Sequence, residues 1–408
     1  MTGFFQKIEF INDPIANIIE GETLFVTDEK EKLTALSDII SNPIAIYGLG
    51  ECAHWFHEIG INRLGIEPIV ALDRDPQDAF WYGVQTSTAE RYISQIKHKI
   101  DQIEIIVCVG SRHNYNLIKE FLKTLGCFRV HFLHDFYEFH SFFISEPVDV
   151  SRRIQNNKQK FKFAYSLISE ELSKEIFCRL LHVHVKREPL DIPASSQAHQ
   201  YFPADLPVSI NYSTYVCCGA YDGENIRRLN ESIGKSETIL CFEPEPKIYS
   251  KLAMCARQHI GQAADNIICF HNAVSDQNGI QSFISGDGLG SRLDKKGEDF
   301  AQCVKLDDAL SGFKPTFISM DIEGAEVAAI QGGRQIIIDN LPDLAICVYH
   351  YPEQVADVIE TIHSIFDGYQ FYIRNYTGYL TETVVYATTK TSKSALTIPT
   401  LDPSNLKK

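Results

Sequence analysis

The sequence has no stretch of apolar residues long enough for a membrane span, which takes about 18 or more in a row. Its N-terminus, MTGFFQKIEFINDPIANIIEGE, lacks the basic-then-apolar pattern of a secretion signal. The eleven cysteines contain no C-x-x-C pair and no Cys/His spacing suited to zinc. These absences argue against membrane, secreted and zinc proteins. We expect a cytoplasmic protein whose cysteines are buried and reduced.

Basic residues are outnumbered, with 38 Lys and Arg against 53 Asp and Glu and a formal net charge of −15. A protein that holds nucleic acid through its phosphates needs a basic face, so we expect no nucleic-acid partner. The composition is otherwise that of a globular protein, with 44% hydrophobic and 22% charged residues. A length of 408 residues predicts two domains, and nothing in the sequence defines an oligomeric state.

Apolar runs alternate with helical patterns in two parts of the chain, which predicts two α/β domains with mostly parallel sheets. In the first part, a strand, a glycine-rich turn and a helix are expected in PIAIYGLGECAHWFHEIG, and a further strand ends at Asp73. A helical pattern and a Pro/Ser-rich linker separate the two parts. The predicted boundaries are 1–150 for an N-terminal Rossmann-like domain, 151–200 for the helical segment and linker, 201–390 for the second α/β domain and 391–408 for a loose tail.

The second domain is predicted to contain five buried strands and a late antiparallel pair, which together make a mostly parallel seven-stranded sheet. The five strands are expected at 214–218, 238–243, 267–271, 316–321 and 343–349. The late pair is expected in YQFYIRNYT and ETVVYATTK. Helices are expected at 223–233, 246–259, 324–339 and 352–366.

Glycines and polar residues gather where these strands end, and ligands of open α/β sheets bind at that edge. Gly219 and Gly223 follow the first strand, where glycine permits a sharp turn and a close approach of backbone N–H groups to a ligand. Glu243 ends the second strand, and an acid there can accept hydrogen bonds from a ribose diol. After the third strand, the amide of Asn272 can pair with an adenine edge, and Ala273 can lie against the ring. Together these residues indicate an adenosine-containing ligand.

The segment FISMDIEGAEVAAIQGG carries the strongest local signal. An apolar strand delivers Asp321 and Glu323 to the sheet edge. Gly324 then permits a tight turn, and Glu326 falls in the first turn of a helix. Three carboxylates this close repel one another unless a cation, a proton or a hydroxyl-bearing ligand offsets them. A structural interpretation is also open, in which Glu323 and Glu326 cap the helix and stabilise its dipole.

Segments of residues 200–390 resemble, in order, motifs of the FkbM-type S-adenosylmethionine-dependent methyltransferases: CCGAYDG, FEPEP, NAVSD, GLGSRL, VKLDDAL, SMDIEGAE and AICVYHYPE. The first α/β domain resembles an extra domain of some larger members. The resemblance implies a class I, Rossmann-like methyltransferase fold with S-adenosylmethionine as methyl donor. It also implies a small-molecule or glycan acceptor that is methylated on a hydroxyl group, as in a sugar or a natural product.

The family motifs imply roles for individual residues. The glycine loop after the first strand would flank the methionine part of the donor. Glu243 would hold the ribose, and Asn272 with Ala273 would meet the adenine. Asp321 would face the junction between donor and acceptor. The full cofactor-binding set carried over onto this chain is Cys217, Gly219, Ala220, Tyr221, Gly223, Glu243, Pro244, Asn272, Ala273 and Asp321.

Two positions depart from the family pattern. Cys217 stands where the family normally has Asp, an acid that helps to orient the amino group of the donor, and Ser319 stands where Lys is common. Loss of one charge-assisted hydrogen bond costs about 1.5–3 kcal/mol, which weakens donor binding about ten- to a hundredfold. The departure at Cys217 keeps open a non-catalytic ligand-binding protein with a degenerate methyltransferase domain. The retained Glu243 and DIEGAE favour an enzyme.

Methyl transfer to oxygen needs alignment of the reacting groups and removal of one proton. Asp321 and His350, at the ends of the fourth and fifth strands, are the candidate catalytic bases, and histidine suits proton transfer near neutral pH. His350 can instead be a core or capping histidine. A divalent metal held by Asp321 and Glu323 is a further alternative that we do not expect.

The N-terminal domain offers a third hypothesis. GLGECA at 48–53, with Asp73 further along the chain, approaches the dinucleotide fingerprint with its distal acid. This pattern leaves open a nicotinamide-dependent oxidoreductase. The competing interpretation is that this sheet is an empty scaffold.

Overall fold

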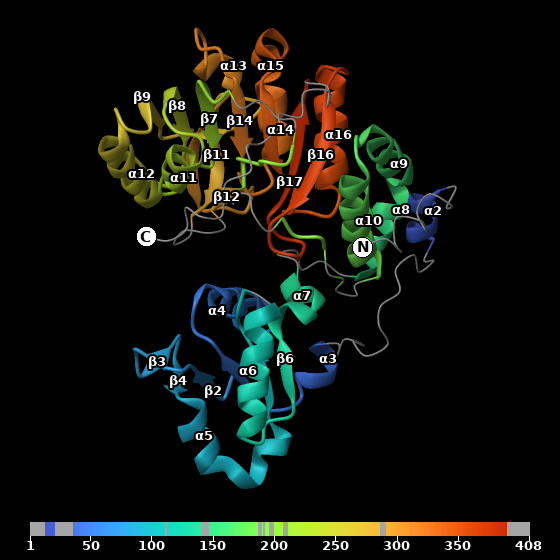
Figure 1. The fold of residues 1–408 in the computed structure, drawn as a ribbon, viewed down its shortest axis with the longest axis vertical. Helices are drawn as coiled ribbons and strands as arrows, with labels where there is room; N and C mark the ends of the chain where they lie inside the picture. The colour runs from blue at the N-terminus through green and yellow to red at the C-terminus, as the bar shows by residue number, and fades with distance from the viewer. Residues whose placement is uncertain are drawn as a thin grey trace, which may run out of the picture. The chain divides into compact units, whose positions relative to one another are not determined.

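Figure 1 shows a computed structural model of the protein, which describes residues 13–20, 36–110, 112–140, 147–186, 190, 192–195, 200–206, 211–285 and 291–389. The tail predicted at 391–408 lies outside these residues. The chain divides into two compact units, one of Met1–Gln197, Cys347–Glu360 and Ile373–Val385, the other of Ala198–Ile346, Thr361–Tyr372 and Tyr386–Lys408. The domain boundaries that we placed from the sequence stay predictions. Within the described parts of the chain, no helix is long and apolar enough to cross a membrane.

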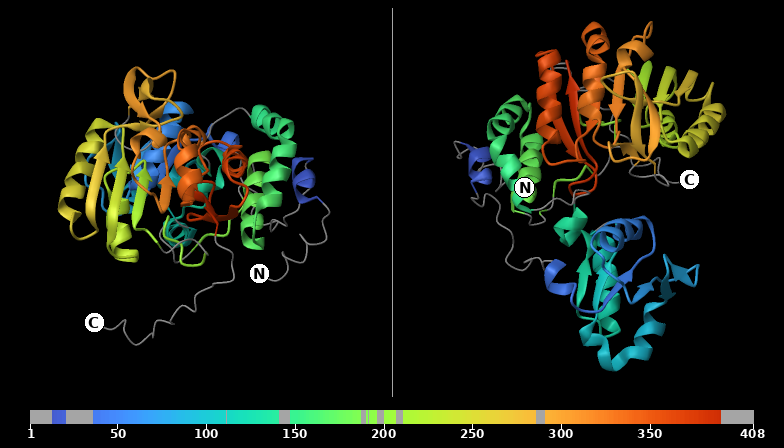
Figure 2. Two further views of the ribbon diagram at one scale, coloured as in Figure 1. Left: turned by 90° about the horizontal axis from the view of Figure 1, so that it is seen from above. Right: turned by 180° about the vertical axis from the view of Figure 1, so that it is seen from behind.

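The N-terminal part forms a six-stranded sheet of order β3-β4-β2-β1-β5-β6. The β2–β1, β1–β5, β5–β6 and β2–β4 pairs are parallel, and β3 and β4 form an antiparallel hairpin at the edge (Figures 1 and 2). The predicted Rossmann-like arrangement is therefore present. The strands are β1 (Ile44–Tyr47), β2 (Val70–Leu72), β3 (Phe80–Trp81), β4 (Val84–Ser87), β5 (Glu104–Val107) and β6 (Val130–Phe132).

Helices cover both faces of this sheet, which explains why its strands are continuous apolar runs. Ala45 and Tyr47 of β1 pack into a core shared with α5 and α6, and Ile44 and Ile46 pack into a second core shared with α4 and η2. This alternation follows from the period of two along a strand. The helical segments are α4 (Glu51–Trp55), η2 (Phe56–Arg63), α5 (Ala89–Ile96), η3 (Lys97–Gln102), α6 (Arg112–Thr124), η4 (Leu133–Asp135) and α7 (Tyr137–His140).

The segment predicted to be helical consists of α8 (Pro147–Asn156), α9 (Lys158–Leu167) and α10 (Glu171–Lys186). An N-terminal helix, α2 (Pro14–Ile19), packs against all three, and α3 (Leu36–Ile39) precedes β1. Arg153 of α8 donates from Nε to Glu353 Oε1 at 2.8 Å, and the backbone N–H of Ile373 donates to Ser173 Oγ of α10 at 2.7 Å. The helical segment is therefore attached to C-terminal residues far away in the sequence.

The second α/β part contains the predicted seven-stranded sheet, of order β16-β17-β15-β14-β7-β8-β9. The four pairs β15–β14, β14–β7, β7–β8 and β8–β9 are parallel. The loop 376–382 between the last two strands is too short for a parallel crossover, so β16 and β17 are antiparallel. The strands are β7 (Thr214–Cys218), β8 (Ser236–Phe242), β9 (Ala264–Phe270), β14 (Phe317–Met320), β15 (Asp343–Cys347), β16 (Gln370–Asn375) and β17 (Thr383–Thr388).

The four helices predicted in this part are present, with one correction, and the short helix α13 was not predicted. The single helix expected at 324–339 is two helices that meet at Gly333, whose φ of −107° and ψ of 16° are not helical. The preceding Gly332 is tightly packed, and an added Cβ would lie 2.0 Å from the backbone oxygen of Ser275. The helices are α11 (Glu224–Ser232), α12 (Pro246–His259), α13 (Leu306–Ala309), α14 (Glu326–Gly332), α15 (Arg334–Asn340) and α16 (Gln354–Ile365).

A second, four-stranded sheet of order β10-β13-β11-β12 was not expected from the sequence. Its strands are β10 (Ala273–Val274), β11 (Gly279–Ile284), β12 (Arg292–Leu293) and β13 (Asp299–Val304). One face buries a small core of Ala273, Phe283, Ala301 and Cys303, against which Leu293 packs. The sheet is an insertion between β9 and β14.

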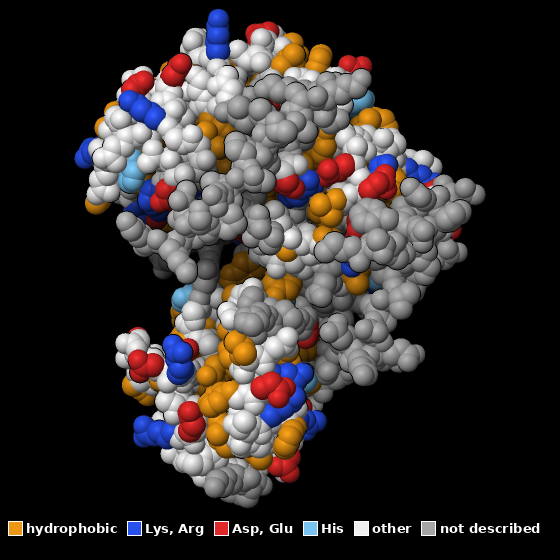
Figure 3. Space-filling view, viewed as in Figure 1, with side chains coloured by type: hydrophobic (Ala, Val, Ile, Leu, Met, Phe, Trp, Pro, Cys, Tyr) orange, Lys and Arg blue, Asp and Glu red, His pale blue; other side chains and the backbone are white. Residues whose placement is uncertain are grey.

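Charged side chains of both signs are interspersed on the face of the molecule drawn in Figure 3. The expectation that nucleic acid is not a partner stays a prediction.

Candidate active site

An open cavity of about 120 Å³ lies where β7, β8 and β14 end, and β10, β11 and β12 of the small sheet contribute its remaining walls. Cys217, Ala220, Gly223 and His350 are not among its lining residues. Eight residues singled out from the sequence do line it: Gly219, Tyr221, Glu243, Pro244, Asn272, Ala273, Asp321 and Glu323. The sequence therefore identified most of one cavity wall.

The turn after β7 is held so tightly that only glycine fits its first position. Gly219 has a φ of +78°, and a Cβ built there would lie 1.8 Å from the backbone oxygen of Asp321. The N–H groups of Gly219 and Ala220 both donate to the carbonyl oxygen of Phe242, each at 3.0 Å. The turn is thus fixed between the ends of β8 and β14.

A different contact restricts position 223 to glycine. Its φ is +92°, and a Cβ built there would lie 2.8 Å from both Cβ and Sγ of Cys255 on α12. Close packing of α11 on α12, rather than exposure to the cavity, explains this position.

Glu243 follows β8 and is only 6% exposed. Its Oε2 accepts the backbone N–H of Tyr221 at 3.1 Å, and its Oε1 accepts the N–H of Glu245 at 2.8 Å. Burial raises the pKa of Glu243 to about 7; the two N–H groups partly oppose this rise, and the charge of Glu245 adds to it. Each carboxylate oxygen retains a second lone pair. The side chain can therefore accept further hydrogen bonds from a ligand.

The loop after β14 is organised by Glu326. Its Oε1 accepts the backbone N–H groups of Ile322 at 2.8 Å and of Gly324 at 3.4 Å, so this carboxylate ties the loop to the start of α14. The capping interpretation thus describes Glu326. Glu323, at a φ of +57°, lines the cavity instead.

Asp321 has a contact that sequence analysis missed. The hydroxyl of Tyr201, which is buried in the segment before β7, donates to Asp321 Oδ2 at 3.3 Å. Tyr201 lies next to the predicted linker, and no pattern in the sequence pairs it with Asp321. Tyr201 therefore helps to fix the orientation of the Asp321 carboxylate.

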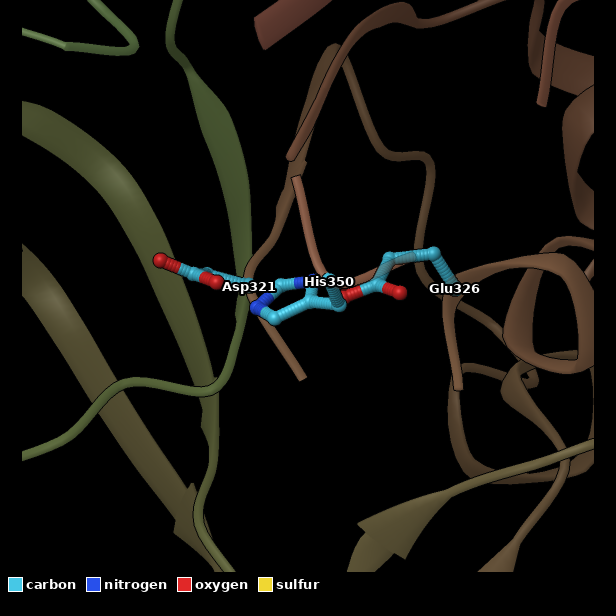
Figure 4. Close-up of side chains that lie close together, drawn as sticks. All are labelled: Asp321, Glu326 and His350. Carbon is cyan, nitrogen blue, oxygen red and sulfur yellow. The ribbon is translucent and has the colours of Figure 1, made fainter. Parts of the chain in front are cut away.

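His350 follows β15 and lies near Asp321. Asp321, Glu326 and His350 each offer one possible ligand atom, and these atoms all lie within 4.8 Å of one another (Figure 4). The backbone N–H of His350 donates to Gln354 Oε1 at 2.8 Å, and Gln354 Nε2 lies 3.5 Å from His350 Nδ1. The group that the structure brings together therefore contains Glu326, not the Glu323 that we paired with Asp321 as a metal site.

Cys217 is buried among uncharged side chains; burial raises the pKa of its thiol, and the nearby Asp321 carboxylate adds to this rise. It is 1% exposed and pairs in register with Ser319 on β14. The hydroxyls of Tyr215 and Ser319 are 2.7 Å apart, and Asn225 Nδ2 lies 3.5 Å from Cys217 Sγ. The two departures from the family pattern are thus neighbours on adjacent strands.

The small sheet supplies cavity residues to which we assigned no role from the sequence, namely Phe283, Ser291, Arg292 and Leu293. The last three belong to GLGSRL, so a motif signal existed for them. Arg292 is the one basic side chain among the lining residues that the structure describes, and its Nε lies 3.5 Å from Asp294 Oδ2. Because three acids also line the cavity, it suits a ligand that carries hydroxyl groups or positive charge.

Comparison with known proteins agrees with this geometry. Residues 218–373 match the family model of the methyltransferase FkbM domain. The crystal structure of methyltransferase FkbM from Methylobacillus flagellatus KT superimposes with a TM-score of 0.61 and 21% identity, over 94% of this chain and 98% of that chain. At this identity the likeness shows a shared fold. No curated protein matches the sequence significantly.

Two other solved structures are more distant. Fibrillarin from Aeropyrum pernix, with natively bound S-adenosyl-L-methionine, has a TM-score of 0.28 and 12% identity over 45% of this chain and 68% of that chain. A putative rRNA-methylase from Clostridium thermocellum has a TM-score of 0.29 and 9% identity over 43% of this chain and 86% of that chain. Because both TM-scores are low, neither carries an argument. The family match and the sheet topology agree, and residues 218–373 are a methyltransferase FkbM domain of the Rossmann-like α/β class.

Proposed function

We propose that the protein is an S-adenosylmethionine-dependent methyltransferase that methylates a hydroxyl group on a sugar or natural-product acceptor. One observation carries the proposal. One cavity within a methyltransferase FkbM domain is lined by seven of the ten residues that the family motifs assign to the donor. Cys217, which motivated the alternative of a non-catalytic protein, is not among the lining residues.

The residues of the cavity fit this donor. Glu243 is a buried carboxylate beside the cavity, and a ribose diol would supply it with hydroxyl donors. Asn272, whose Nδ2 donates to the carbonyl oxygen of Gln302 at 3.3 Å, keeps its amide oxygen for a ligand donor. Three carboxylates in the lining favour a cationic donor electrostatically.

The chain's own residues would then position the acceptor and remove its proton. S-adenosylmethionine, when bound, supplies an electrophilic methyl group. Asp321 is held by Tyr201 and can accept a hydrogen bond from the acceptor hydroxyl. His350, whose ring is positioned beside Gln354, is the proposed base that takes the hydroxyl proton. No step of this proposal needs a metal.

Calorimetric titration with S-adenosylhomocysteine tests donor binding without knowledge of the acceptor. We expect micromolar binding by the wild type and at least tenfold weaker binding by Glu243→Gln, because the amide cannot offer two anionic oxygens to the ribose. The matched control is Glu237→Gln on β8, the strand that Glu243 follows, at an exposed position outside the cavity lining. Absence of binding by the wild type would overturn the proposed function.

Donor affinity should also depend on pH. Burial raises the pKa of Glu243 to about 7, so its carboxylate is mostly protonated at pH 6 and mostly ionised at pH 8. The ionised form is the better acceptor for hydroxyl groups. Affinity for S-adenosylhomocysteine should therefore rise up to about tenfold between pH 6 and pH 8. The rise should disappear in Glu243→Gln, which also controls for ionisation of the ligand itself.

His350→Ala should separate binding from chemistry. We expect donor affinity within twofold of the wild type, because His350 is not among the residues that line the cavity. Methyl transfer from labelled S-adenosylmethionine to a panel of monosaccharide and glycan acceptors should fall about 100-fold or more. Transfer at the wild-type rate would remove His350 from the mechanism, and a parallel loss of donor binding would assign it a structural role.

A further inference from the structure

The N-terminal sheet repeats the strand arrangement that positions the methyltransferase cavity. Strands β4-β2-β1-β5-β6 follow the same chain order and spatial order as β9-β8-β7-β14-β15, and every neighbouring pair in both sets is parallel. In such sheets a ligand binds outside the carboxyl ends of the strands, where the strand order reverses. In the N-terminal sheet that point lies between β1 and β5.

The glycine turns at these two points have the same backbone environment. Gly48 has a φ of +94°, and a Cβ built there would lie 2.9 Å from the backbone oxygen of Cys108, just as one on Gly219 would meet the oxygen of Asp321. The N–H of Gly48 donates to the carbonyl oxygen of Leu72 at 2.8 Å, which matches the bond from Gly219 to the end of β8. Both turns therefore approach the neighbouring strands closely.

The acid beside each turn is held in the same way. Asp73 follows β2 as Glu243 follows β8. Asp73 Oδ2 accepts the N–H of Leu49 at 2.9 Å, and Oδ1 accepts the N–H of Asp75 at 3.1 Å. Glu243 accepts N–H groups from the same two places, the glycine turn and two residues beyond the acid. A carboxylate fixed at both oxygens by the backbone still has lone pairs for a hydroxyl pair.

Aromatic side chains lie on the elements next to the turn at Gly48, namely the β3–β4 hairpin, α4 and η2. Tyr82, at the tip of the β3–β4 hairpin, stacks on His57 with ring centroids 3.6 Å apart, and its hydroxyl is 2.7 Å from His54 Nδ1. Tyr82 is 51% exposed. An exposed ring held in place by two histidines is a surface on which a flat base can stack.

We propose that the turn at 48–50 and Asp73 bind a ribonucleoside-containing ligand whose ribose hydroxyls donate to the Asp73 carboxylate. Cys108 occupies the position that Asp321 has in the other sheet, so this site lacks the acid of the proposed methyl transfer and would bind without catalysing that reaction. The inference concerns residues 44–132 alone. It goes beyond the proposed function and does not depend on it.

Calorimetric titration of the full-length chain with ADP, UDP and NAD⁺ tests the proposal. The titrations use Glu243→Gln as background, so that ribose binding in the methyltransferase cavity is suppressed. We expect at least one of the three probes to bind, and to bind tenfold or more weakly after Asp73→Asn. Asp75→Asn is the matched control, because the Asp75 side chain contacts Gln77 and not the turn.

Two further measurements keep the result interpretable if Asp73→Asn disturbs folding. The 2′-deoxy form of the probe that binds should lose affinity on the unaltered Asp73 chain. S-adenosylhomocysteine should bind Asp73→Asn in an otherwise wild-type chain as it binds the wild type. Failure of all three probes to bind, or equal affinity with and without Asp73, would overturn the proposal whatever the donor titration shows.

Discussion

Gly219→Ala is expected to abolish donor binding and to lower the free energy of unfolding by about 4 kcal/mol. Alanine is strained in the left-handed backbone conformation that Gly219 adopts, and its Cβ would lie 1.8 Å from the backbone oxygen of Asp321. That overlap is relieved only by moving the end of β14 away from β7, and Asp321 moves with it. Urea unfolding and titration with S-adenosylhomocysteine measure the two effects.

Gly234→Ala is the matched control for this experiment. Gly234 has a φ of +98° but nothing within 4 Å of an added Cβ, so its replacement carries the backbone cost without the overlap. We expect a loss of about 1 kcal/mol and unchanged donor affinity. Equal losses for the two variants would show that β14 does not restrict the turn, contrary to the packing described above.

Cys217→Asp, which restores the usual family residue, is expected to destabilise the protein by about 3 kcal/mol at pH 8. The new carboxylate would be buried among the hydroxyls of Tyr215 and Ser319 and the amide of Asn225, with no cation in that cluster. Burial raises the folded-state pKa of such an acid above its unfolded value. The loss should therefore be small near pH 4, grow as the pH rises, and level off above the folded-state pKa.

Ser319→Lys should reverse much of this loss. Residues 217 and 319 pair in register on adjacent strands, so the double variant would place a lysine beside the new aspartate. We expect the double variant to be at least about 2 kcal/mol more stable than the sum of the two single variants predicts. Cys217→Asn provides the uncharged control. Additive single effects would show that the two departures from the family pattern are independent.

The sequence predicts the large, mostly parallel sheet well because most of its strands are buried apolar runs, with the half-exposed edge strand β9 as the exception. The strand at 214–218 has the predicted bounds, since an apolar run ends at Gly219. The helix at 324–339 was predicted without its break, although the pair Gly332 and Gly333 marks the place. Only the fold reveals that Ser275 lies against Gly332.

Other parts of the site depend on contacts that no local pattern records. The small sheet has strands as short as Arg292–Leu293 and an exposed face. It therefore lacks the apolar runs from which the main sheet is predicted. The grouping of Asp321, Glu326 and His350 depends on the order and register of β14 and β15, which a single sequence does not specify. The two departures at Cys217 and Ser319 were visible, but their adjacency was not.

The cavity is assembled from two parts of the chain that can change separately. The turns after β7, β8 and β14 belong to the main sheet, where a misplaced atom disturbs the fold, as Gly219 illustrates. The opposite wall, with Arg292 and Leu293, belongs to an insertion that has its own small core. Under the proposed function, we therefore expect substitutions in the insertion to alter acceptor selection while the turns of the main sheet are retained. Under the proposed function, we expect exchange of residues 275–304 between homologous proteins to transfer acceptor preference with little loss of stability.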